Sequence, residues 1–207
     1  MSNQFFEIKN ANFVASEKNK VKNVNLKIKN KGDIISLLGP SGVGKTTILR
    51  TIAGLQKLNS GEIYLNDKLI SSNEVHIEPE KRNIALSFQD NSLFPNYKVI
   101  DNINFGKKRS NGNGFSYDAE DIIKLLHIEP ILEKFPHQIS AGEAQRVSLA
   151  RSLMSKPDLL LLDEPFSNID ENFKEEIQVK LKQILNQNKI TTIIVTHDSN
   201  EAFYLAD

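Results

Sequence analysis

The sequence predicts an α/β fold with a mostly parallel sheet, an N-terminal antiparallel β subdomain and an inserted helical subdomain. Three features carry this prediction. A glycine-rich loop lies between a strand-like run and a helix-like run within 33–55. Two apolar runs, Leu159–Asp163 and Ile190–Val195, are typical of parallel strands that are buried on both faces. Between 91 and 155 the apolar residues instead follow helical spacing.

The glycine-rich loop matches the pattern G-x-x-x-x-G-K-[ST], which binds phosphate groups. Glycines let backbone N–H groups approach phosphate oxygens, and the start of the next helix adds unpaired donors. We expect Lys45 to reach the β- and γ-phosphates of a nucleotide and the Thr46 hydroxyl to bind Mg²⁺. The alternative is a plain glycine-rich turn, which the flanking strand and helix disfavour. The expected nucleotide-binding residues here are Gly39, Pro40, Ser41, Gly42, Val43, Gly44, Lys45, Thr46 and Thr47.

Composition excludes several classes of protein. The chain has 207 residues, with 26 basic and 26 acidic side chains, so no overall charge favours nucleic acid as a partner. It has no cysteine, which excludes disulfides and thiolate metal sites. The first residues lack a signal-peptide pattern, and no run approaches the ~20 apolar residues of a membrane span. We therefore expect a soluble cytoplasmic protein whose membrane role, if any, comes through a partner.

The remaining elements follow from periodicity and turn residues. Alternating patterns predict half-buried antiparallel strands at 6–10 and 24–28, and shorter runs predict strands at 62–65 and 84–88. Residues 71–82 are polar and are expected to form a loop. Helices are expected at 99–105, 117–126, 141–154 and 170–186. These elements give a core with the β subdomain, 1–90 and 156–207, and a helical subdomain, 91–155.

Two acids, Asp163 and Glu164, follow the run of four leucines. The carboxyl end of a buried parallel strand is where open α/β sheets bind ligands. There Asp163 can hold Mg²⁺, and Glu164 can orient an attacking water. The alternative is that both acids cap the next helix. The upstream phosphate loop favours the functional interpretation.

Three more polar positions are open to two interpretations each. Gln89 and His197 stand at the ends of predicted strands, where each is either an ordinary turn residue or part of a γ-phosphate site. Ser140 precedes a predicted helix and Glu143 follows three residues later, which is the pattern of a capping box. The same helix start is also a place for a phosphate, which would then belong to the nucleotide of another subunit.

Taken in order, these motifs resemble the ATP-binding subunits of ABC transporters over nearly the whole chain. The resemblance implies a P-loop NTPase core that uses ATP and Mg²⁺. It implies catalytic roles for Glu164, His197 and Lys45, metal binding by Thr46, Gln89 and Asp163, and nucleotide contacts from Gln89, Ser140 and Gly142. The motifs that carry it are Gly39–Thr46 (Walker A), Gln89 (Q-loop), Ser140–Arg146 (signature), Leu159–Glu164 (Walker B), Ser167–Asp170 (D-loop) and His197 (switch histidine).

The resemblance also implies partners. These are transmembrane permease subunits, a second ATP-binding subunit packed head to tail and, indirectly, a solute-binding protein, with the chain on the cytoplasmic face of the cytoplasmic membrane. The segments 79–84 and 89–95 resemble the importer branch that serves iron, sulfate, molybdate, thiamine, polyamines or sugars. The alternatives are the ATPase of an exporter, a soluble ABC ATPase in DNA repair or translation, and a regulatory cassette without hydrolysis.

The sequence departs from the family pattern in three places. Ala141 and Glu143 stand where the family usually has glycine and glutamine. The position that aligns best with the family's adenine-stacking aromatic is Ala15, which is not aromatic. Phe13 lies close to this position and is either the stacking residue or a core residue. The family usually continues beyond the position of Asp207, so the chain is either naturally short or a fragment.

Overall fold

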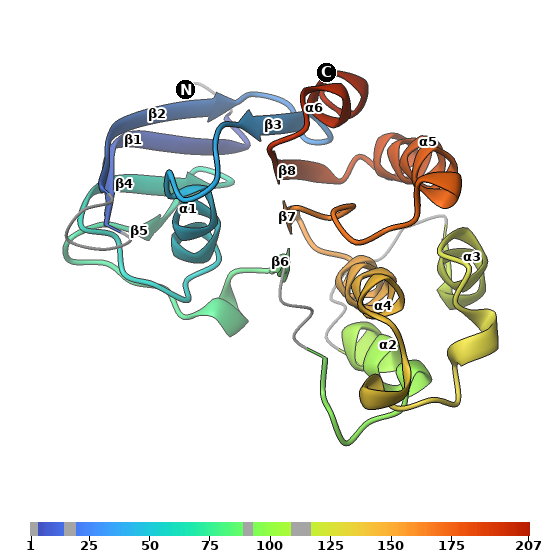
Figure 1. The fold of residues 1–207 in the computed structure, drawn as a ribbon. Coiled ribbons are helices and arrows are strands. Elements are labelled where there is room, and N and C mark those ends of the chain that lie inside the picture. The colour runs from blue at the N-terminus through green and yellow to red at the C-terminus, as the bar shows by residue number, and fades with distance from the viewer. Residues whose placement is uncertain (1–3, 15–19, 89–92, 109–116) are drawn as a thin grey trace.

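Four parallel strands form the central sheet, in the order β3-β8-β7-β6 (Figure 1). A computed structural model of the protein describes residues 4–14, 20–88, 93–108 and 117–207. The fold class is confirmed: the core sheet is parallel, and helices pack on it. The parallel strands are β3 (Ile34–Leu38), β6 (Ile84–Ser87), β7 (Leu159–Asp163) and β8 (Thr191–Thr196).

A second, antiparallel sheet has the strand order β2-β1-β4-β5 and lies beside the first (Figure 1). One of its strands, β5, was not predicted. It follows a two-residue turn in which Asn66 and Asp67 have φ of 51° and 58°. Such left-handed pairs are typical of tight hairpins, so these two residues were the missed signal. The strands are β1 (Phe6–Val14), β2 (Lys20–Ile28), β4 (Ser60–Leu65) and β5 (Lys68–Ser71).

The described helices include the helix predicted after the glycine-rich loop, the four predicted further along the chain and one more at the C-terminal end. This last helix, α6, is capped by Asp198, whose side chain accepts from the backbone N–H groups of Asn200 and Glu201. No helix in the described residues has the length and apolar character needed to cross a membrane. The α-helices are α1 (Lys45–Ile52), α2 (Val99–Lys108), α3 (Ala119–Leu125), α4 (Ala141–Met154), α5 (Glu171–Gln187) and α6 (Ser199–Leu205); short 3₁₀ helices lie at Pro79–Lys81, Glu129–Ile131 and Pro136–Gln138.

The four leucines of β7 divide the apolar interior into two cores. Leu159 and Leu161 face a core that contains α1 and the antiparallel sheet. Leu160 and Leu162 face the opposite core, which contains α2, α3, α4 and α5. All four are fully buried, and burial of each stabilises the fold by about 1.5–3 kcal/mol. The inserted helices therefore share a core with the central sheet.

Arg82 joins α1 to the antiparallel sheet through a buried guanidinium group. The whole residue is only 3% exposed. The guanidinium donates to the carbonyl oxygens of Thr51, Ile52 and Ile77 and to the Ser71 hydroxyl. Burial lowers the pKa of Arg82 to about 10, so the group remains charged at neutral pH. The end of α1 thus obtains donors for carbonyl groups that the helix leaves unpaired.

We predict that Arg82→Ala destabilises the protein by at least about 2 kcal/mol, because it removes the guanidinium donor of the Ile52 and Ile77 carbonyl oxygens, whereas Thr51 O keeps its bond from Gly54 N. The measurement is the free energy of unfolding in urea. Lys81→Ala, at the exposed neighbouring position, is the control and should have little effect. Equal stability of the two variants would contradict this role for Arg82.

Candidate functional site

The register of the parallel sheet brings three strand ends to one edge. Leu38, the last residue of β3, lies opposite Thr196, the last residue of β8. Asp163, at the end of β7, lies opposite Val195. The glycine-rich loop, His197 and Glu164 follow these strand ends directly, so they meet although they are far apart in the sequence.

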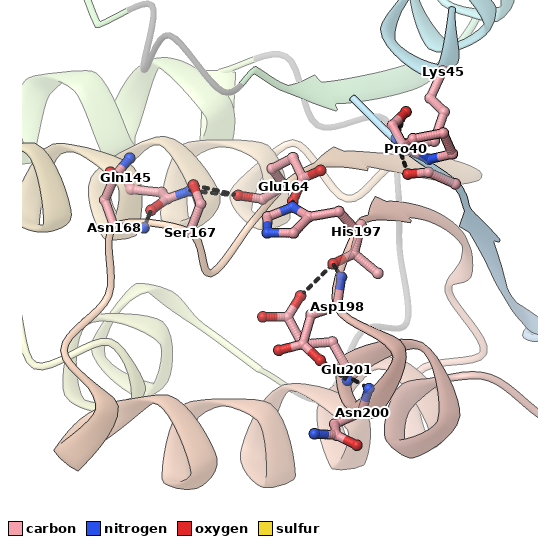
Figure 2. Close-up of polar contacts among 12 residues, drawn as sticks. Pro40, Lys45, Gln145, Glu164, Ser167, Asn168, His197, Asp198, Asn200 and Glu201 are labelled. Atoms are coloured by element: carbon pink, nitrogen blue, oxygen red, sulfur yellow. Dashed lines mark hydrogen bonds and ion pairs between the residues drawn. The ribbon is translucent and has the colours of Figure 1, made fainter. Parts of the chain in front are cut away.

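The glycine-rich loop turns sharply between β3 and α1. Gly42 and Gly44 have φ of 80° and 108°, which side-chain-bearing residues rarely adopt. At Gly44 a Cβ would also lie 2.7 Å from the Val21 side chain. Lys45 is nearly buried, and its Nζ donates to the carbonyl oxygens of Gly39, at 2.6 Å, and Pro40, at 3.0 Å (Figure 2). The ammonium group therefore lies within the curl of the loop.

A cavity of about 310 Å³ lies over this loop. Its size is within the range of small-molecule sites. Gly39, Pro40 and Val43 are part of the loop, but they do not line the cavity. The predicted residues that line it together are Ser41, Gly42, Gly44, Lys45, Thr46, Thr47, Asp163, Glu164 and His197, and Val195 completes the wall.

Asp163 is 3% exposed and faces Thr46. Burial raises the pKa of Asp163 above its ordinary value, and a hydrogen bond from Thr46 together with the charges of Arg50 and Lys45 acts in the opposite direction. A carboxylate and a hydroxyl are oxygen ligands of the kind that Mg²⁺ prefers. Within the described residues no cluster of three acidic or histidine side chains surrounds this point, so Thr46 and Asp163 alone would not complete the ligand shell of an ion.

Glu164 and His197 contact each other at the mouth of the site. His197 Nδ1 lies 2.8 Å from Glu164 Oε2 (Figure 2). The hydrogen bond and the negative charge of Glu164 raise the pKa of His197 above its ordinary value. The His197 side chain is 61% exposed and that of Glu164 is 11% exposed, so the pair joins solvent to the cavity. Glu164 also has φ of 50°, a strained conformation often found at functional sites.

A network that the sequence analysis missed supports the turn that carries His197. Lys174 Nζ lies 2.7 Å from Glu201 Oε1 and 3.3 Å from Asp198 Oδ2. Glu201 is 5% exposed and accepts a hydrogen bond of 2.7 Å from Thr196 Oγ1. The network joins α5 and α6 to the last residue of β8, and its sequence signal was the capping pattern that begins at Asp198.

The segment that begins α4 lies apart from the cavity. Ser140 accepts a hydrogen bond from the Glu143 backbone, and Glu143 accepts one from Ser140 N, which confirms the capping box. The bond from Ser140 N lowers the pKa of Glu143. Neither Ser140 nor Gly142 lines the cavity over the glycine-rich loop. A Cβ at Gly142 would lie 2.3 Å from the Asn168 carbonyl oxygen, so close packing accounts for this glycine.

Phe13 and Gln89 are the other two residues predicted to contact the nucleotide. Phe13 is 1% exposed and lies in the core beside α1, so its ring has no open face for an adenine base. The prediction that Phe13 binds nucleotide is therefore wrong, and the core interpretation holds, because Phe13 points inward from β1. Gln89 and Ala15 lie outside the described residues.

Comparisons with known proteins find relatives over most of the chain. The Fe(3+) ions import ATP-binding protein FbpC of Fusobacterium nucleatum is 41% identical over 189 residues, which cover 90% of this chain and 50% of the relative. The glucose import ATP-binding protein GlcV of Saccharolobus solfataricus is 40% identical, over 89% of this chain and 53% of the relative. The chain thus spans about half the length of these curated relatives.

A solved structure has the same fold. The ATP-binding cassette MJ0796, a dimer in a post-hydrolysis state with ADP and Pi, superposes with a TM-score of 0.81 and 28% identity, over 96% of this chain and 90% of that one. A family model described as "ABC transporter" matches residues 21–167. The phosphate loop, the acids after β7 and these matches together show that the chain belongs to the ABC transporter family.

Proposed function

We propose that the protein binds and hydrolyses ATP with Mg²⁺, as the ATP-binding subunit that powers an ABC importer for a small solute or ion. The observation that carries this proposal is the cavity over 39–47, which brings Lys45, Asp163, Glu164 and His197 together. ATP hydrolysis requires phosphate binding, charge neutralisation and a positioned water, and these side chains supply all three.

The phosphates of ATP would bind to the loop and to the start of α1. Backbone N–H groups at the N-terminus of α1 are unpaired within the helix, and its dipole favours negative charge. The Gly39 and Pro40 carbonyl oxygens that Lys45 Nζ now contacts belong to the loop that would hold the phosphates. Lys45 Nζ can therefore exchange these contacts for contacts with phosphate oxygens. A lysine there neutralises charge that develops on the transferred phosphoryl group.

Thr46 and Asp163 are the described residues that fit a Mg²⁺ ion, and Gln89 is proposed as a third ligand. When bound, the ion would neutralise phosphate charge and orient the phosphate oxygens. Burial raises the pKa of Asp163 because its carboxylate is poorly solvated there. A bound cation would stabilise this carboxylate, so Asp163 suits a role as a metal ligand.

Glu164 is proposed to accept a proton from the attacking water or to orient it, and His197 to contact the γ-phosphate. The Glu164 carboxylate lines the cavity, and its contact with His197 Nδ1 fixes its direction. His197 with a raised pKa also carries positive charge more readily than an ordinary histidine, which suits a site for phosphate.

A second ATP-binding subunit would complete the site. Ser140 is exposed at the start of α4, away from the cavity of its own chain. A head-to-tail pair of subunits would place Ser140 and Gly142 of each chain against the nucleotide of the other. This arrangement is supported by the solved relative, which is described as a dimer. We retain 91–155 as the proposed helical subdomain that presents this segment.

A permease subunit would bind the groove between the core and the inserted helices, at the cytoplasmic face of the membrane. This groove has a volume of about 300 Å³, and its mixed wall includes the apolar side chains of Leu55, Phe88, Phe94 and Phe105 beside polar ones such as Glu80 and Arg151. Leu55 is 53% exposed and Phe105 is 37% exposed, so both offer apolar contact to a partner. The names of the relatives, which are import ATP-binding proteins, support import. A solute-binding protein is proposed as an indirect partner.

We predict that Glu164→Gln leaves ATP binding intact and lowers kcat for ATP hydrolysis by about 10²-fold or more, because the neutral amide cannot accept the proton from water. The measurements are equilibrium nucleotide binding and steady-state phosphate release. Glu175→Gln, an exposed position on α5, is the matched control. Wild-type turnover in Glu164→Gln would remove Glu164 from this role.

We also predict that the pKa of His197 in the wild type lies above its ordinary value, because the hydrogen bond and the charge of the Glu164 carboxylate favour the protonated ring. In Glu164→Gln the pKa of His197 should fall, because both the charge and the charge-assisted bond are lost. Titration of the ring by NMR measures this change. In Glu175→Gln the value should stay at that of the wild type, and an unchanged value in both variants would contradict the contact.

The partners are tested by copurification of the tagged, full-length protein from its own cells. We expect a membrane permease and a solute-binding protein. We also expect Leu55→Glu to reduce recovery of the permease, because it places a charge among the apolar side chains of the groove. Phe203→Glu, outside the groove, is the control. A permease recovered without a solute-binding protein would favour export, and recovery of neither would favour a soluble ATPase.

A further inference from the structure

Gln145, on the second turn of α4, connects this helix to the segment that follows β7. Gln145 is buried, with 2% of the residue exposed. Its Nε2 donates to the main-chain carbonyl oxygen of Glu164, at 2.6 Å, and to Ser167 Oγ, at 3.2 Å. Its Oε1 accepts from Asn168 N at 2.9 Å. Figure 2 shows the side chain of Gln145 directed toward Glu164, Ser167 and Asn168.

The partners of Gln145 determine which way its amide points. In the opposite orientation, an oxygen atom would face the Glu164 carbonyl oxygen, and an NH₂ group would face the Asn168 N–H. Only the observed orientation pairs each donor with an acceptor. Both the oxygen and the NH₂ group of the amide have partners here, so this position requires a glutamine. A residue that only filled space would need neither group.

These bonds stabilise an unfavourable main-chain conformation at Glu164. Its φ of 50° is a strained conformation for a residue with a side chain, and it persists only where neighbouring contacts support it. Glu164 N donates to the Val195 carbonyl oxygen at 2.9 Å. Glu164 O accepts from Gln145 and, at 3.1 Å, from Ser167 Oγ. The main chain is thus held on both sides, and this directs the carboxylate toward His197.

The same segment contacts the start of α4 a second time. Gly142 lies three residues before Gln145 and packs against the Asn168 main chain so closely that a Cβ has no room. Residues 142 and 145 therefore lie on the same side of the helix and contact the 164–168 turn together. A displacement of the exposed start of α4 would reach Glu164 through these contacts.

We propose that Gln145 is a positioning residue, which holds Glu164 in its left-handed conformation and so couples the start of α4 to the Glu164–His197 pair. This inference rests on the proposed role of Glu164 in ATP hydrolysis, although the geometry itself does not depend on it. Gln145 touches neither the cavity nor the glycine-rich loop. Its effect is therefore on catalysis and not on binding of ATP.

The test compares Gln145→Met with Gln178→Met in the full chain. Met has a similar length and no donor, and Gln178 is a matched control, since it is 8% exposed on α5 and its Nε2 has no hydrogen-bond partner among the described residues. We expect Gln145→Met to lower kcat by at least about tenfold, because small displacements of a catalytic group are costly. KM and the equilibrium affinity for ATP should match those of Gln178→Met. In a Glu164→Gln background, the same change should lower kcat no further.

A second measurement does not depend on hydrolysis. The ¹⁵N signals of the His197 ring report its contact with Glu164, and they should move in Gln145→Met but not in Gln178→Met. The proposal is overturned if kcat and these signals are the same in Gln145→Met and Gln178→Met. It is also overturned if KM is the only quantity that differs between the two variants. Should Gln145→Met fail to fold, Ser167→Ala is measured instead, since it removes one hydrogen bond to Glu164 O. It must move the His197 signals away from their wild-type positions, and unchanged signals overturn the proposal. A wild-type protein without ATPase activity would refute the proposed function, while the His197 signals would still decide the role of Gln145.

Discussion

The alignment of β3, β8 and β7 is the constraint on which the rest of the structure depends. These strands end level with one another, so a phosphate loop, a pair of acids and a histidine meet at one edge. The same alignment divides the leucines of β7 between two cores. A slip of one residue would turn each side chain to the other face, and it would damage both cores and the site together. Stability and site geometry therefore depend on the same hydrogen bonds.

Several features of the site lower stability and support chemistry. Asp163 is buried at the expense of its charged form, and Glu164 has a strained backbone. Each is compensated by particular neighbours, Thr46 and Lys45 for the first, and Gln145 and Ser167 for the second. Such local costs are common where side chains must be held ready for a substrate.

The helix α4 has two sides with different roles. Its start is exposed and capped by its own side chains, and this part is proposed to serve a neighbouring subunit. Its inner side carries Gly142 and Gln145, which pack against the turn after β7. The helix thus lies between the proposed subunit interface and the proposed catalytic carboxylate. This arrangement gives a physical route by which binding of a partner can affect hydrolysis.

The sequence by itself determined the fold class, the phosphate loop, the acids of β7 and the capping box of α4, because each depends on the spacing of nearby residues. It also contained the local signals for β5 and α6, which were overlooked. Only the tertiary structure decided that Phe13 points into the core, that Arg82 closes the end of α1 and that Gln145 supports Glu164. These facts join residues that are distant in the chain, and a pairing of that kind arises only when the strands and helices pack. The phosphate loop is a local motif, whereas the site around it is a product of the sheet.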